Sequence, residues 1–180
     1  MDNNISKVVS MLLDGKIGAI FEGYAESGSS ALGHRSIIAN PTLRNGKDLV
    51  NKVKNRESFR PFAGSVLEDL SHKWFNLDAV NGKSPYMLYT VPVLKNKRRL
   101  IPAITHVDGS CRVQTVRKGT VFYNIINEFF IKTNIPILLN TSFNLAGQPL
   151  VHTLEDAKQT FYNSELYFLY DVNTDNLMSK

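Results

Sequence analysis

The sequence predicts an α/β fold, in which helices pack against a twisted sheet of mixed parallel and antiparallel strands. Apolar side chains recur at helical spacing in residues 4–14 and 120–133, whereas residues 112–116 alternate with period two, as a half-buried strand does. Helical and strand patterns alternate along the chain, but not strictly, which favours a mixed sheet over a purely parallel one. The 180 residues contain no repeat or linker, so we expect one domain over residues 1–180.

The N-terminal elements follow from local patterns. Gly15 is expected to end the helix over residues 4–14, because glycine readily adopts the left-handed conformation that terminates helices. A short apolar strand is predicted at residues 17–21, followed by a glycine- and serine-rich loop over residues 22–34. Residues 47–56 are predicted to form a helix with a basic face and a narrow apolar face.

Strand patterns dominate the middle of the chain. We predict strands at residues 62–67 and 86–94, the second being the longest strand candidate, and an exposed basic turn at residues 95–99. Residues 137–139 form a continuous apolar run after Pro136, which is typical of a strand covered on both faces. The C-terminal part adds helices at residues 120–133 and 154–163 and a last strand at residues 166–170.

Composition narrows the class of protein. Apolar residues make up 43% and charged residues 21%, which excludes a disordered chain. No apolar run approaches the roughly 18 residues of a membrane span, and the N-terminus lacks the order of a signal peptide. With the single Cys111, these features lead us to expect a cytoplasmic protein. The net charge of +5 suits nucleic acid, an anionic small molecule or solubility alone.

Four cations lie within nine positions of the predicted helix and the segment after it. Lys54 and Arg56 do not share a helix face, but they can turn toward one site if the helix ends near Arg56. Together with Lys52 and Arg60, they could bind a phosphorylated ligand, with arginine supplying a bidentate fork and lysine a point charge. The alternative is a solvated basic face.

Two further polar clusters could contact a ligand. Residues 140–144 follow the buried run at residues 137–139, and the carboxyl end of a core strand is where α/β proteins place a crevice; ordinary turn chemistry is the alternative. His106 and Asp108 precede a turn and Arg112, but a lone histidine is more often structural. The sequence contains neither glycine-rich phosphate-loop motif and no metal-ligand spacing of histidines.

These clusters, in this order, resemble the C-terminal half of the O-carbamoyltransferases that modify nodulation factors and antibiotics. That half is a YrdC-like domain, related to enzymes that make threonylcarbamoyl-adenylate. Lys54-x-Arg56 and Ser142-x-Asn144 match the K-x-R and S-x-N signature of YrdC-like domains, and the resemblance extends from about residue 8 to 170. The matching stretches are residues 31–41, 51–63, 102–116, 138–144 and 153–157.

The resemblance implies substrates and a partner. In such enzymes this domain binds ATP and carbamoyl phosphate, cleaves the latter to carbamate and phosphate, and joins carbamate to the α-phosphorus of ATP with release of pyrophosphate. The carbamoyl-adenylate passes to an N-terminal actin-like domain that holds iron, where an acceptor hydroxyl receives the carbamoyl group. This chain begins where the YrdC-like domain should begin, so we expect the actin-like domain to be a separate chain or a lost half.

The resemblance also implies residue roles, because fixed cations would offset the repulsion between carbamate and a triphosphate. The expected catalytic residues are Lys54, Arg60, Arg112 and Ser142. The expected ligand-binding residues are Arg35, Arg56, His106, Asn140, Thr141 and Asn144. We expect no metal site in the chain itself, and Mg²⁺ would accompany ATP.

One departure from the family pattern leaves alternatives open. Ser30 stands where the family phrase has an arginine, and whether Arg35 compensates is left open by the sequence. A non-catalytic module that binds nucleotide or carbamoyl phosphate is therefore one alternative. An RNA-binding protein with a basic concave surface is the other, whereas a membrane partner is not expected.

Overall fold

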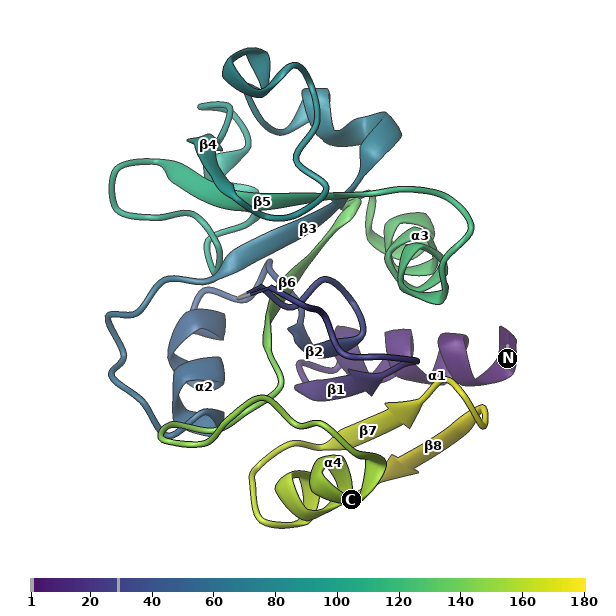
Figure 1. Cartoon of the computed structure of the whole chain (residues 1–180). Helices are drawn as coiled ribbons and strands as arrows, with labels where there is room; N and C mark the ends of the chain where they lie inside the picture. Colours follow the sequence, from purple (N-terminus) through teal and green to yellow (C-terminus); the bar gives the residue numbers. More distant parts are fainter. Residues whose placement is uncertain (1, 29) are drawn as a thin grey trace.

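The computed structural model describes residues 2–28 and 30–180, and in these residues the strands form one eight-stranded sheet in the order β4-β5-β3-β6-β2-β1-β7-β8. The sheet twists strongly, so that β6 runs between the β4-β5-β3 part and the β7-β8 part (Figure 1). The helices and strands are α1 (Asp2–Leu13), β1 (Gly18–Phe21), β2 (Arg35–Ala39), α2 (Gly46–Val53), β3 (Ala63–Leu67), β4 (Tyr89–Pro92), β5 (Ser110–Val116), α3 (Val121–Thr133), β6 (Ile137–Ser142), α4 (Leu154–Tyr162), β7 (Phe168–Asp171) and β8 (Asn176–Ser179).

The expected mixed α/β sheet is confirmed. Strand β3 pairs in parallel with β5, and β1 pairs in parallel with β7. The remaining pairs are antiparallel, including the central pairs of β6 with β2 and with β3. The apolar run Ile137, Leu138 and Leu139 lies in β6 with no exposed surface, as a strand covered on both faces requires.

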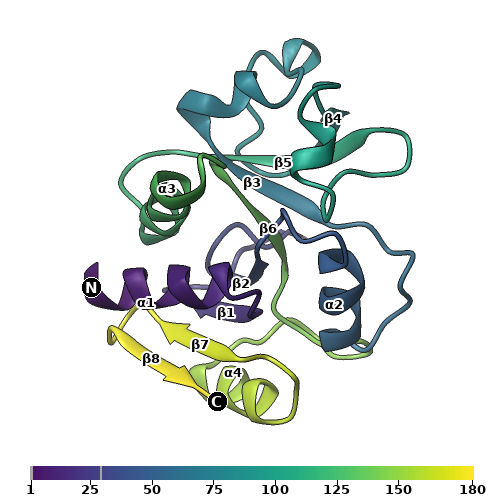
Figure 2. The same ribbon diagram turned by 180° about the vertical axis from the view of Figure 1, so that it is seen from behind.

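The two strongest helical patterns form α1 and α3, which pack side by side (Figure 2). Leu12 of α1 and Phe129 of α3 are completely buried. Helix α1 ends at Leu13, and Gly15, whose φ of +76° lies in the left-handed region, follows two residues later. Helix α3 is capped by Thr120, whose side chain accepts a hydrogen bond from the Tyr123 amide. No helix among the described residues is long and apolar enough to span a membrane.

Two predicted elements are shorter in the structure. The predicted strand over residues 86–94 reduces to β4 at the sheet edge, because Met87 has a φ of +55° and interrupts the extended backbone. The longest strand is instead β5. The helix predicted over residues 47–56 ends at Val53, and Asn55 adopts a φ of +52°. This early end moves the chain that carries Arg56 out of the helix.

Strands β2 and β8 were not predicted as strands. Strand β2 is fully buried in the middle of the sheet although it begins with Arg35 and Ser36, so its sequence lacks a continuous apolar run. Strand β8 is short and pairs only with β7 at the other edge.

The turn after β6 approaches the end of α2, and this contact brings two predicted motifs together. The Ala146 amide donates a hydrogen bond to the Lys54 carbonyl oxygen at 2.8 Å. Figures 1 and 2 both show the chain after β6 passing the end of α2.

Candidate functional site

A cavity of about 620 Å³ opens between the loop after α2 and the turn after β6. Five of the residues that the sequence predicted for the site line it together with five others. The lining consists of Lys54, Asn55, Arg56, Glu57, Arg60, Ser142, Asn144, Leu145, Ala146 and Gly147. The K-x-R and S-x-N motifs, separated by more than 80 residues in sequence, therefore share one cavity wall.

Lys54 links the two motifs directly. Its side chain is buried, and its Nζ donates hydrogen bonds to the Ser142 carbonyl oxygen, to the Asn144 carbonyl oxygen at 2.7 Å and to Asn144 Oδ1 at 3.0 Å. Ser142 Oγ donates to the same Asn144 Oδ1 at 2.7 Å. The ammonium group thus holds the turn after β6 in place at the cavity.

Burial gives Lys54 an unusual protonation equilibrium. Desolvation by burial, and to a smaller extent the positive charge of Arg56, lower the pKa of Lys54 from its ordinary 10.5 to about 7. An anion in the cavity would favour the charged form of this lysine and raise its pKa.

Arg56 is held by two neighbours. Its Nε donates to Asn51 Oδ1 at 2.7 Å, and its guanidinium carbon lies 4.5 Å from the centroid of the Phe62 ring. Arg60 is more exposed and pairs through Nε with Glu57 Oε2 at 2.9 Å. The cavity thus presents three cationic side chains and one carboxylate, an arrangement suited to a polyanion.

Arg112 and His106 lie near the cavity but do not line it. Arg112 is exposed on β5, opposite Ala63 of β3. Burial lowers the pKa of Arg56, and the positive charges of Arg60 and Arg112 act in the same direction. His106 Nε2 lies 3.1 Å from the Phe62 carbonyl oxygen, and its Nδ1 lies 3.3 Å from Ser110 Oγ. His106 therefore contacts the backbone of Phe62, whose ring lies against the Arg56 guanidinium group.

Asn140 and Thr141 precede the cavity along β6. Asn140 is completely buried, and its Nδ2 donates to the Ala31 carbonyl oxygen at 3.0 Å and to Ser65 Oγ at 2.9 Å. Thr141 pairs with Ile37 of β2 and is half-buried. The structure brings neither side chain into the cavity lining, and Asn140 instead attaches the loop before β2 to the sheet.

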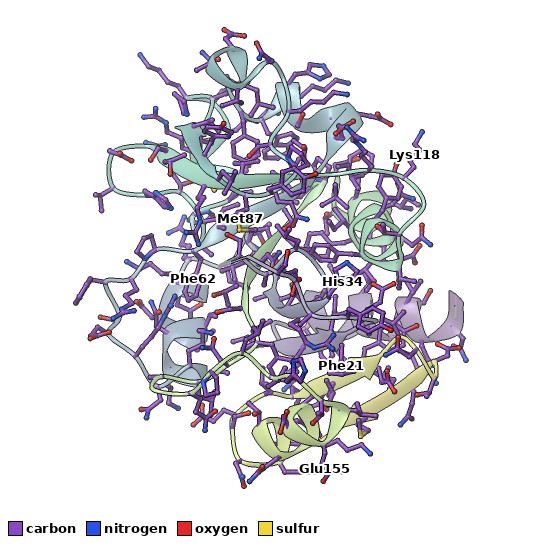
Figure 3. All side chains as sticks on the ribbon, viewed as in Figure 1. Phe21, His34, Phe62, Met87, Lys118 and Glu155 are labelled. Carbon is purple, nitrogen blue, oxygen red and sulfur yellow. The ribbon has the colours of Figure 1, made fainter. Side chains whose placement is uncertain are left out.

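Arg35 is also apart from the cavity. Its guanidinium group donates to the carbonyl oxygens of Glu22, His34, Gly23 and His152, and it lies 3.6 Å from the centroid of the Phe21 ring. These contacts use both Nη atoms in fixing backbone segments. In Figure 3, Phe21 lies well away from Phe62, which is beside the cavity.

Arg35 therefore lies outside the lining of this cavity, and both of its Nη atoms already have backbone partners. Ser30 itself lines a different cavity, of about 820 Å³, over the loop before β2.

Sequence reasoning missed two residues of the site. Asn51 is buried on α2, three positions before Lys54, the residue that follows the last residue of the helix. Glu57 lies three positions before Arg60, and this spacing could have indicated their ion pair. Within residues 2–28 and 30–180, no group of three His, Cys, Asp or Glu side chains is arranged to hold a metal ion.

Comparison with solved structures defines the fold class as YrdC-like. The chain superposes on full-length HypF in its phosphate- and nucleotide-bound form with a TM-score of 0.64 and 16% identity, covering 98% of this chain and 28% of HypF. It superposes on P. abyssi Sua5 complexed with L-threonine with a TM-score of 0.62 and 14% identity, covering 94% of this chain and 51% of Sua5. At these identities the likeness shows the fold alone.

The sequence places the chain in a particular family. Residues 9–176 match the carbamoyltransferase C-terminus family, and the chain belongs to it. It is 42% identical to nodulation protein NolNO of Sinorhizobium fredii and 40% identical to nodulation protein NolO of Bradyrhizobium diazoefficiens, in each case over 92% of this chain. The matched region is 25% and 31% of those proteins, so the chain spans about a quarter to a third of their length.

Proposed function

We propose that this chain binds ATP and carbamoyl phosphate in the cavity between α2 and β6 and forms carbamoyl-adenylate. The observation that carries the proposal is the convergence of Lys54, Arg56 and Arg60 with Ser142 and Asn144 on one cavity. Membership of the carbamoyltransferase C-terminus family supports the carbamoyl substrate, and the YrdC-like fold is compatible with a nucleotide site.

The chemistry requires an anion to attack an anion. Water first cleaves carbamoyl phosphate to carbamate and phosphate, and a carbamate oxygen then forms a bond to the α-phosphorus of ATP as the bond to pyrophosphate breaks. Cations fixed around the phosphates lower the repulsion in this step, and Mg²⁺ carried by ATP would add positive charge. Arg56 and Arg60 supply N–H donors to phosphate oxygens, whereas Ser142 and Asn144 orient the ligand by hydrogen bonds.

The pKa of Lys54 predicts that ATP binding takes up a proton. An ATP anion favours the charged ammonium and raises its pKa, so affinity is highest where Lys54 is already protonated and falls as pH rises above about 7. The decrease approaches about tenfold per pH unit until the pKa of the complex is reached. Calorimetry at pH 8 in two buffers of different ionisation enthalpy should show proton uptake, and affinity that is constant between pH 7 and 9 would contradict the prediction.

Glu57 is predicted to weaken anion binding, because its carboxylate forms an ion pair with Arg60 and places negative charge on the cavity wall. Glu57→Gln should tighten ATP binding about threefold to fivefold, a small effect because the ion pair is exposed. Glu155→Gln, at an exposed position of α4, removes the same charge elsewhere and should leave affinity unchanged. Equal effects of both variants would show that only the net charge matters.

Transfer of the carbamoyl group to an acceptor hydroxyl is assigned to a separate actin-like domain. The relatives are three to four times as long as the region that they share with this chain, which leaves room for such a domain. The present chain then supplies the activated carbamoyl group and leaves acceptor recognition to its partner.

The proposed activity is tested by ATP–pyrophosphate exchange with the purified chain. Labelled pyrophosphate should enter ATP only when carbamoyl phosphate is present. Folded protein that binds ATP tightly but shows no exchange would overturn the catalytic assignment and favour the non-catalytic binding module. Protein that binds neither ATP nor carbamoyl phosphate would refute both.

A further inference from the structure

Asn51 lies behind the cavity wall and makes three side-chain hydrogen bonds to the loop after α2. Its side chain is 1% exposed. Nδ2 donates to the carbonyl oxygens of Ser58 and Arg60, each at 3.0 Å, and Oδ1 accepts from Arg56 Nε at 2.7 Å. Both amide hydrogens and the amide oxygen are therefore used, and the side chain attaches the loop after α2 at three points.

These contacts determine which atoms of Arg56 face a ligand. Asn51 occupies Nε, and the Phe62 ring covers one side of the guanidinium plane. Arg56 lines the cavity, and Nε is already bonded to Asn51. The two Nη groups are therefore the donors of Arg56 that remain available to a ligand. An arginine held in this way loses less side-chain freedom when it binds a phosphate, so more of the contact energy becomes affinity.

Asn51 also controls the rest of the loop. Its backbone oxygen accepts from the Arg56 amide at 3.0 Å, in addition to the two side-chain bonds to the carbonyls of Ser58 and Arg60. The loop has few other anchors, because residues 57 to 60 are exposed. The position of Arg60 at the cavity therefore depends on the same buried amide.

We propose that Asn51 is a positioning residue of this site, which orients Arg56 through Nε and fixes the loop that carries Arg60. The expected consequence is tighter binding of the ATP phosphates, and this consequence rests on the proposed function. The arrangement itself can be tested without any ligand.

A double-mutant cycle measures the consequence. Asn51→Ala should weaken ATP binding about tenfold in the wild-type background but less than threefold when Arg56 is already alanine, because the main group that it positions is then absent. A merely structural role would give the same loss in both backgrounds, and that outcome would overturn the inference. Asn96→Ala, in the exposed turn before Arg98, is the matched control and should have no effect.

A ligand-free measurement keeps the inference separate from the proposed function. In ¹H–¹⁵N spectra, the Nε–H signal of Arg56 should exchange slowly with solvent, unlike that of exposed Arg99. Asn51→Asp retains an oxygen that accepts from Nε and should preserve this signal, whereas Asn51→Ala should lose it. If Asn51→Ala does not fold, the wild type and Asn51→Asp still decide the question.

The ATP-binding cycle and the ligand-free measurement distinguish failure of the proposed function from failure of the inference about Asn51. If ATP does not bind to wild-type protein while Arg56 Nε–H is protected, the proposed function fails and the positioning by Asn51 stands. If Arg56 Nε–H exchanges as fast as that of Arg99 in wild-type protein, Asn51 does not hold Arg56 and the inference is overturned.

Discussion

Lys54→Met is expected to reduce carbamoyl-phosphate-dependent ATP–pyrophosphate exchange by about 100-fold or more, the usual effect of removing one preorganised group that stabilises transition-state charge. Methionine keeps a long unbranched stem in the buried position but removes the ammonium group. The cavity then loses the cation that lies between the two motifs, and the Ser142 and Asn144 oxygens lose their shared donor. Steady-state exchange rates at saturating ATP measure the effect.

The control for this variant is Lys52→Met, two positions earlier in α2 and outside the cavity lining. Lys52 is exposed and pairs with Glu165 at 3.1 Å, outside the cavity. The Lys52→Met variant makes the same chemical change as Lys54→Met and should retain pyrophosphate exchange close to the wild-type rate. Thermal melts of both variants separate lost chemistry from lost folding. Exchange by folded Lys54→Met within threefold of wild type would contradict the role assigned to Lys54.

Phe143→Ala is expected to lower the free energy of unfolding by about 3–5 kcal/mol, the typical cost of deleting a buried aromatic ring. Phe143 has no exposed surface and lies between Ser142 and Asn144 in the chain. Its amide donates to the Arg35 carbonyl oxygen and its own carbonyl accepts from Val151, so the backbone is held on both sides. The buried ring thus anchors the turn that presents the S-x-N motif.

Chemical denaturation of Phe143→Ala beside Phe59→Ala tests this expectation. Phe59 is 75% exposed in the loop after α2, and its truncation should change stability by less than about 0.5 kcal/mol. A similar loss of stability in both variants would show that burial of Phe143 does not anchor the turn. A loss of exchange by Phe143→Ala at temperatures where it is fully folded would show that the turn also needs the ring for its geometry.

The fold class and most elements could be predicted because they depend on neighbouring residues. Apolar periodicity located α1 and α3, and the run at residues 137–139 located β6. The same reasoning failed for β2, because burial in the middle of the sheet, rather than an apolar pattern, determines that strand. It also extended the α2 helix too far, because Asn55 adopts a left-handed backbone and the Asn55 and Arg56 amides bond back to the Lys52 and Asn51 carbonyl oxygens, which ends the helix.

Motif spacing predicted Lys54, Arg56, Arg60, Ser142 and Asn144, which the structure places on one cavity. It could not distinguish them from Arg35, whose guanidinium group is used by backbone carbonyls of segments far apart in sequence. A count of cations says nothing about which of them already has partners.

Residue pattern alone was therefore enough to establish the class of fold, the family and the two motifs, because each is written in short stretches of chain. The folded structure was needed to show that Lys54 is desolvated against oxygens 88 and 90 residues away and that Asn51 holds Arg56. Desolvation and hydrogen-bond partnership arise only when distant segments meet, and they decide which charges remain available to a ligand.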